Sequence, residues 1–261
     1  MKKFVIFGCG YLGNIVADAY INGLMPEFEL IGLYSRSQDK TLFLANKLAN
    51  AGFNVKACSS IDELLALKPD FLAEAASPMG MKEIALLALE KGISVACISV
   101  GAFADDTFKA EVYKIGSKNN SKVYICSGAT GGLDVLRTAT LMGNAKAKFF
   151  NENGRHAYLR TPENQTAESG KHIIFNGNGR EAIDTFPSGL NVAVAASISS
   201  VGVNKMQVAM QSTIGFRGDT QRVEIQNDEV HAVVDVYSAT ASIAGWSIVS
   251  TLNNAVATIV F

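Results

Sequence analysis

The chain has 261 residues and 48% hydrophobic content, enough for one large or two modest domains with a substantial core. Its 23 basic and 24 acidic residues give a net charge of -1, so overall charge favours neither nucleic acid nor an anionic membrane surface as a partner. The first apolar run is too short for a signal peptide, and no run approaches the roughly 18 apolar residues of a membrane span. We expect a cytoplasmic protein that binds small ligands.

The first half of the chain alternates short apolar runs with helical patterns. The apolar runs lie at residues 3–8, 28–35, 54–59, 70–77, 94–101 and 122–128, and helices are expected from Tyr11, Gln38 and Met79 and between the last two runs. Runs that are apolar at consecutive positions are typical of strands buried on both faces of a parallel sheet. This half therefore predicts a doubly wound parallel α/β sheet.

The second half, from about residue 144, is more polar and richer in turns. Residues 149–170 are expected to be irregular, strand candidates cover 171–177, 205–212, 221–226 and 229–238, and helix candidates cover 180–187, 191–202 and most of 238–257. Several of these strands alternate apolar and polar residues, which suits a sheet with one wet or interface-facing side. We predict a second α/β domain with an open sheet.

Three glycines with G-x-G-x-x-G spacing, Gly8, Gly10 and Gly13, lie between the first apolar run and the first helix. The missing side chains permit a tight turn, the approach of a pyrophosphate and close packing of helix on strand, respectively. The helix then presents unpaired N–H groups to phosphates. We expect a Rossmann dinucleotide site that includes these glycines, Tyr11 and Leu12; the alternative is a purely structural turn.

The end of the second strand predicts the type of dinucleotide. An NAD enzyme usually has an acidic residue here, roughly 20 residues past the glycines, to bind the ribose 2'-hydroxyl. This chain instead has Ser35, Arg36 and Ser37, which suit a 2'-phosphate. We expect NADP, with NAD as the alternative.

The fourth strand ends at the edge where ligands bind in open α/β sheets. Small residues there, Ala76, Ser77 and Pro78, leave room for a nicotinamide ribose. Glu74, just before them, is expected to be a solubilising residue at the strand end.

The cysteines and histidines offer few ligands for a metal. Cys9, Cys58, Cys97 and Cys126 lie far apart without a C-x-x-C pair, so we expect reduced thiols and no bound metal. The three histidines are each expected to be surface or satisfied structural residues: His156, His172 and His231.

Four segments carry a family resemblance: CSGATGGLDVL from residue 126, EAASP from 74, ISVGAFAD from 98 and FNGNGREAIDTFPSGLNVAVAAS from 175. Together they resemble the L-aspartate dehydrogenase family. The resemblance implies a homodimer with a Rossmann domain, here residues 1–128 plus 239–261, and a substrate and dimerisation domain, residues 129–238. The family reaction moves a hydride from Cα of L-aspartate to NAD(P)+, and the resulting iminosuccinate hydrolyses to oxaloacetate.

By position, the resemblance places Ala129 and Asn191 at the cofactor. Ser127, Gly128 and Thr130 belong to a glycine-rich loop whose backbone donors could bind a substrate carboxylate, although a tight strand-to-helix connection is the alternative. Arg160 falls near a basic family position and could pair with the carboxylate of an amino-acid or oxo-acid substrate; the alternative is a surface arginine.

The chain departs from the family where the family has an Asn and, two residues later, a catalytic His. Asp219 and Gln221 occupy these positions, and glutamine cannot titrate near neutral pH. Asp219 is then the candidate base and Gln221 a group that polarises the substrate. A nucleotide-binding sensor or scaffold that has lost catalysis is the alternative function. A sugar or cyclic-imine reductase is less well supported, because no lysine motif follows the fifth strand.

Overall fold

The computed structural model describes residues 1–154, 170–186 and 189–261. They form two compact units: unit 1 comprises Met1–Gly128 and Ser242–Phe261, and unit 2 comprises Ala129–Ala241. In the described part of the chain, no helix has the length and apolar character of a membrane span.

Unit 1 contains a six-stranded sheet, sheet A, in the order β3-β2-β1-β4-β5-β6, with every pairing parallel. Its strands are β1 (Lys2–Phe7), β2 (Phe28–Tyr34), β3 (Lys56–Ala57), β4 (Phe71–Glu74), β5 (Ser94–Cys97) and β6 (Val123–Ile125). Its helices are α1 (Tyr11–Ile21), α2 (Gln38–Asn50), α3 (Ile61–Ala66), α4 (Pro78–Glu90), α5 (Asp106–Asn119) and α9 (Ser242–Val256), with a 3-10 turn η1 (Val100–Ala104). This order confirms the predicted doubly wound α/β sheet.

Burial of consecutive residues explains why strands of sheet A could be predicted from the sequence. In β1, Phe4, Val5 and Ile6 are all fully buried, because helices cover both faces of the sheet. Strands β4 and β5 also have consecutive buried residues, whereas β3 and β6, at the two edges of the sheet, have none that are fully buried.

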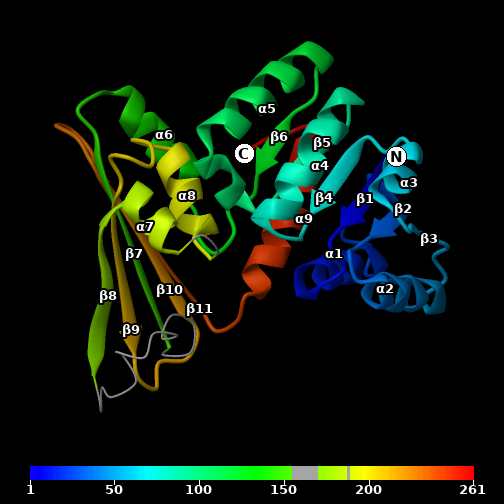
Figure 1. The fold of residues 1–261 in the computed structure, drawn as a ribbon, viewed down its shortest axis with the longest axis horizontal. Coiled ribbons are helices and arrows are strands. Elements are labelled where there is room, and N and C mark those ends of the chain that lie inside the picture. Colours follow the sequence, from blue (N-terminus) through cyan, green and yellow to red (C-terminus); the bar gives the residue numbers. More distant parts are fainter. Residues whose placement is uncertain (155–169, 187–188) are drawn as a thin grey trace. The chain divides into compact units, whose positions relative to one another are not determined.

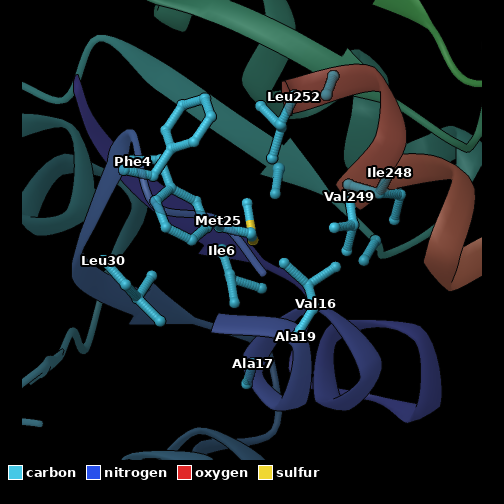
Figure 2. Close-up of a cluster of buried hydrophobic side chains, with 14 of the residues drawn as sticks. Phe4, Ile6, Val16, Ala17, Ala19, Met25, Leu30, Ile248, Val249 and Leu252 are labelled. Carbon is cyan, nitrogen blue, oxygen red and sulfur yellow. The ribbon is translucent and has the colours of Figure 1, made fainter. Parts of the chain in front are cut away.

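The last helix, α9, belongs to the core of unit 1. Figure 2 shows Ile248, Val249 and Leu252 of α9 in one cluster with Val16 of α1 and Ile6 of β1. The two helices approach closely: a Cβ on Gly245 would lie 2.8 Å from the side chain of Ile15. The hydrophobic core of unit 1 is thus completed by a helix that follows unit 2 in the chain.

Unit 2 contains a five-stranded mixed sheet, sheet B, in the order β11-β10-β7-β9-β8 (Figure 1). Its strands are β7 (Lys146–Gly154), β8 (Lys171–Asn178), β9 (Gln207–Thr213), β10 (Asp219–Gln226) and β11 (His231–Ser238), and its helices are α6 (Leu133–Leu141), α7 (Gly179–Thr185) and α8 (Asn191–Ile198). Only β7 and β9 pair in parallel among these strands. The predicted open sheet is confirmed.

Among the described residues of unit 2, helices cover one face of sheet B and none covers the other, here called the open face. Helices α6, α7 and α8 lie on one side, where Leu136, Ala182 and Ala193 pack on Phe149 and Val223 of the strands (Figure 1). Side chains alternate across a strand, so the next residues along β7 and β10 point to the opposite, open face.

The central strand of sheet B, β7, was not predicted. The expectation that residues 149–170 are irregular is wrong up to Gly154, which ends β7. The strand does alternate, with Ala147, Phe149, Asn151 and Asn153 buried on the covered face. Asn151 and Asn153 are polar, so the alternation of apolar and polar residues that indicates a strand ends at Phe149.

Removal of Leu252 tests whether α9 stabilises unit 1. Leu252 is fully buried, so Leu252→Ala should lower the free energy of unfolding by about 2–5 kcal/mol, measured by urea titration. Leu42→Ala, on the exposed side of α2, is the matched control and should change it by less than about 0.5 kcal/mol. Equal effects of the two substitutions would contradict this role of α9.

Candidate functional site

The loop between β1 and α1 has a separate steric reason for each glycine. Gly8 has a φ of +111°, and a Cβ there would lie 2.5 Å from the backbone of Ala75. A Cβ on Gly13 would overlap the carbonyl oxygen of Gly8, so this residue lets α1 pack against the strand end. A Cβ on Gly10 would meet no protein atom within 4 Å, so the backbone here faces space that a ligand can enter.

The start of α1 is suited to a phosphate. Gly10 caps the helix without a side-chain hydrogen bond, which leaves the first-turn N–H groups without a capping side chain. Asn14 donates from Nδ2 to the carbonyl oxygens of Cys9, at 3.3 Å, and Gly10, at 2.9 Å, and so holds the loop. Tyr11 is 59% exposed and Leu12 partly buried. These features fit a dinucleotide diphosphate at the helix N-terminus.

The loop after β2 lies beside the glycine loop, because the Gly8 N–H donates to the Tyr34 carbonyl at 2.8 Å. Arg36 and Ser37 are exposed and Ser35 is partly buried. Ser37 caps α2 without a side-chain hydrogen bond, which leaves its hydroxyl uncommitted to the cap. This edge therefore offers a cation and hydroxyls where an NAD site usually has a carboxylate.

The loop after β4 is the third at this edge of sheet A. The Ala75 N–H donates to the Phe7 carbonyl at 2.8 Å, which ties this loop to β1. Ser77 caps α4 by accepting from the Gly80 N–H at 3.1 Å, and Pro78 is the first residue of the helix. Ala76, between Ala75 and Ser77, is exposed. The structure thus brings the residues of unit 1 that were predicted to bind the cofactor together at the carboxyl ends of β1, β2 and β4.

Glu74 is not the solubilising residue expected from its position at a strand end. It is fully buried, and its carboxylate accepts from the Ala76 N–H at 2.8 Å and from the Ser99 hydroxyl and N–H at 2.8 and 2.9 Å. Burial raises the pKa of Glu74, and these hydrogen bonds oppose the rise. Glu74 therefore links the loops that follow β4 and β5.

The second glycine-rich loop divides between the two units. In unit 1, Ser127 precedes Gly128, whose N–H donates to the Ser247 hydroxyl at 3.1 Å. That donor is engaged within the protein, contrary to the expectation that it faces a carboxylate. In unit 2, Ala129 and Thr130 lead into α6, and Thr130 is buried.

The same loop lies against sheet B. A Cβ on Gly132, which has a φ of +66°, would lie 2.6 Å from the Val234 side chain of β11. Val234 pairs with Val223 of β10, two residues from Gln221 on the same face. The predicted loop and the predicted catalytic pair are thus on neighbouring parts of unit 2.

Of the two remaining predicted site residues, the structure describes Asn191 but not Arg160. Asn191 is the first residue of α8 and is partly buried. Arg160 lies outside the described residues.

Asp219 and Gln221 are neighbours on the covered face of sheet B. Gln221 donates from Nε2 to Oδ2 of Asp219, and Asn151 of β7 donates from Nδ2 to Oδ1 of Asp219 at 2.6 Å. Asn151 also donates to the Thr220 carbonyl at 3.1 Å, and Asn153 donates to Oδ1 of Asn151 at 3.3 Å. The carboxylate is therefore held by two amides from adjacent strands.

Burial raises the pKa of Asp219, and the hydrogen bonds from Asn151 and Gln221 oppose the rise without cancelling it. A carboxylate that is poorly solvated in this way is a stronger base than a surface aspartate. The arrangement can accept a proton at Asp219, whereas Gln221 only donates and accepts hydrogen bonds.

Asn151 and Asn153 were missed in the sequence because the strand that carries them was missed. The alternation of Lys146 to Phe149 was the available signal, and its continuation would have put both asparagines on the same face as Phe149.

The described histidines lie apart from Asp219 and Gln221. His231 is exposed on β11 and lies 3.1 Å from Glu224, which confirms the surface role. His172 is partly buried with an unpartnered Nε2, so it is neither a surface nor a satisfied structural residue. It pairs with Ser212 of β9, two strands from Asn153. His156 lies outside the described residues.

Unsatisfied buried atoms concentrate in unit 2. Four buried side-chain polar atoms in the described chain have no hydrogen-bond partner, and all four belong to this unit: Thr130 Oγ1, Asn153 Oδ1, His172 Nε2 and Gln221 Oε1. Such atoms are costly in a folded protein and call for an explanation such as a ligand.

Other candidate features do not form a second centre. A depression of about 250 Å³ lies on the open face of sheet B, lined by Lys148, Phe150, Arg222 and Glu224 among others, so the sheet separates it from Asp219. The described residues contain no group of three or more His, Cys, Asp or Glu side chains that could hold a metal ion. All four cysteines are buried and free.

Two family models divide the chain between them. Residues 8–126 match the NAD-binding domain of homoserine dehydrogenase, and residues 134–255 match the C-terminal domain of aspartate dehydrogenase. Together with the glycine loop and the parallel sheet, these matches define a nicotinamide-dependent dehydrogenase.

Similar proteins specify the family. An L-aspartate dehydrogenase of Methanosarcina barkeri is 31% identical over 222 residues, covering 80% of this chain and 77% of the relative. One from Methanocaldococcus jannaschii is 29% identical over 245 residues, covering 87% and 88% of the two chains. The aspartate dehydrogenase structure from Thermotoga maritima has the same fold, with a TM-score of 0.74, 22% identity and coverage of 100% and 99%. The chain belongs to the L-aspartate dehydrogenase family.

Alanine substitutions separate folding from cofactor binding in the glycine loop. Gly10→Ala should leave the urea midpoint unchanged, because its Cβ meets no protein atom, yet should weaken NADP+ or NAD+ binding at least about tenfold by calorimetry. Gly13→Ala should lower both stability and affinity, because its Cβ overlaps the Gly8 carbonyl oxygen. Unchanged affinity in Gly10→Ala would place the diphosphate elsewhere.

Proposed function

We propose that the protein catalyses the NAD(P)-dependent oxidative deamination of L-aspartate. The observation that carries this proposal is the partly desolvated Asp219, held by Asn151 and Gln221 in a member of the aspartate dehydrogenase family. The relatives are named for this activity, and a proton acceptor is what the reaction requires from the protein.

The reaction removes one hydride and one proton from the substrate. The loops of unit 1 would hold the nicotinamide cofactor, which when bound would supply the hydride acceptor for Cα of the substrate. The C–H bond breaks, the C–N bond becomes a double bond and the ammonium loses one proton, which gives protonated iminosuccinate. Asp219 receives that proton, while Gln221 orients the amine. Water then converts the imine to oxaloacetate and ammonium.

The residues of each unit have distinct proposed tasks. The loops of unit 1 that contain Gly10, Arg36 and Ala76 bind the cofactor, with further contacts from Ala129 and Asn191. Unit 2 binds the substrate, with Thr130 and the loop around it directed at a carboxylate and Arg160 as a further partner. We propose homodimerisation through the open face of sheet B, which carries exposed apolar side chains of Ile173, Val233 and Tyr237.

Turnover tests the function directly. Reduction of NADP+, followed at 340 nm with L-aspartate at alkaline pH, should exceed that with other amino acids. Tight NADP+ binding without turnover of any amino acid would instead support the sensor or scaffold alternative.

The pH profile tests Asp219 as the base. Because its folded-state pKa is raised, the rate should fall as pH drops through a value above the ordinary range of an aspartate, as Asp219 becomes protonated. Asp219→Asn should lower kcat about 100- to 10,000-fold and remove this acidic limb. An Asp219→Asn enzyme with the wild-type limb would assign the base to another residue.

Gln221→His, which adds a titratable group beside Asp219, should raise the rate.

Cofactor choice is proposed to be NADP, because Arg36 and the hydroxyls of Ser35 and Ser37 suit a 2'-phosphate. Arg36→Ala should weaken NADP+ binding about tenfold or more and leave NAD+ binding within about twofold, measured by calorimetry. Lys40→Ala, on exposed α2, is the control for general loss of positive charge. Equal losses for the two cofactors in Arg36→Ala would refute this preference.

A further inference from the structure

Two carbonyl oxygens beside Asp219 have no donor. Oδ1 of Asn153 and Oε1 of Gln221 are buried without a hydrogen-bond partner, and their residues are only 8% and 7% exposed. A buried acceptor without a hydrogen-bond donor destabilises the protein, so two of them in one cluster indicate a group that arrives with donors.

The orientation of these amides follows from the carboxylate. An ionised carboxylate only accepts hydrogen bonds, so Gln221 and Asn151 must each turn an NH2 group toward Asp219. The oxygen of Asn151 is then occupied by the NH2 group of Asn153. These hydrogen bonds are all donated in the direction of Asp219. The side-chain oxygens of Gln221 and Asn153 are the two acceptors of the network that receive no hydrogen bond.

The two oxygens and the carboxylate share one patch. Asp219 lies opposite Asn153 and Gln221 opposite Asn151 in the pairing of β10 with β7, and all four side chains lie on the covered face. Directly paired residues have Cβ atoms about 4.5–5.5 Å apart. Three acceptor groups are therefore available within the reach of one small ligand.

The donor that matches three acceptors is a primary ammonium. It carries three N–H donors, a positive charge and no acceptor, whereas water has two donors and a hydroxyl has one. The negative charge of Asp219 favours a cation, and no described Lys or Arg side chain is hydrogen-bonded to it.

We infer that Asn153 Oδ1 and Gln221 Oε1, together with Asp219, bind the α-ammonium group of the amino-acid substrate. This inference rests on the proposed function, and it adds Asn153, on a strand that the sequence did not reveal, as a residue that recognises the amine. The same contacts place the ammonium next to the carboxylate that removes its proton.

Succinate, which is L-aspartate without the amine, isolates this contact. Calorimetric titration of the NADPH-loaded protein should give tighter binding of L-aspartate than of succinate. Asn153→Leu should weaken L-aspartate binding about tenfold and leave succinate binding within about twofold, because Asn153 makes no contact with Asp219 in the described hydrogen bonds. Asn50→Leu, at an exposed position of α2, is the control for the same change of residue and should alter neither affinity.

Gln221→Met, similar in shape but without an acceptor oxygen, provides a second variant if Asn153→Leu fails to fold, and should also remove the preference for the amine. Equal weakening of both ligands, no preference in the wild type or binding of neither ligand would overturn the inference. Absence of L-aspartate turnover with NADP+, combined with a retained amine preference, would refute the proposed reaction and leave the amine site supported.

Discussion

A carboxylate can only accept hydrogen bonds, and this constraint organises the polar interior of unit 2. Asp219 requires donors when it is withdrawn from water, and Asn151 and Gln221 supply them from its own strand and the neighbouring one. Those two amides must then turn their oxygens elsewhere. The stabilisation of one partly buried charge thereby creates the acceptors around it, and burial outweighs these hydrogen bonds, so the pKa of Asp219 is raised.

The two units use their interiors differently. In unit 1 the fully buried carboxylate of Glu74 accepts hydrogen bonds from Ala76 and Ser99, and no buried side-chain polar atom of this unit lacks a partner. In unit 2 the covered face of sheet B is apolar near Val223 and Phe149 and becomes polar toward Asp219 and Asn153. The described buried polar atoms that lack partners are therefore confined to unit 2, in and around this polar part of its interior.

The sequence predicted sheet A well because burial on both faces leaves apolar residues at consecutive positions, as in β1. The glycine loop could be predicted because a side chain at Gly8 or Gly13 would overlap the protein backbone, and one at Gly10 would enter the space left for a ligand. Strand β7 was not legible, since its last inward positions are Asn151 and Asn153 rather than apolar residues. The hydrogen bonds between Glu74 and Ser99 and between Ser247 and Gly128 join segments that are distant in the sequence. They depend on the tertiary structure, so a local sequence pattern does not predict them. The local pattern therefore found the part of β10 that begins at Gln221, and it missed both Asp219 at the start of that strand and the neighbouring strand β7.

The position of α9 affects the order in which the protein can fold during synthesis. Every residue of unit 2 leaves the ribosome before Ile248 and Leu252, which close the core around β1 and α1. Unit 2 has contiguous sequence and can assemble while the earlier half of unit 1 still exposes an apolar surface. The nucleotide-binding half, although it is translated first, is thus completed last.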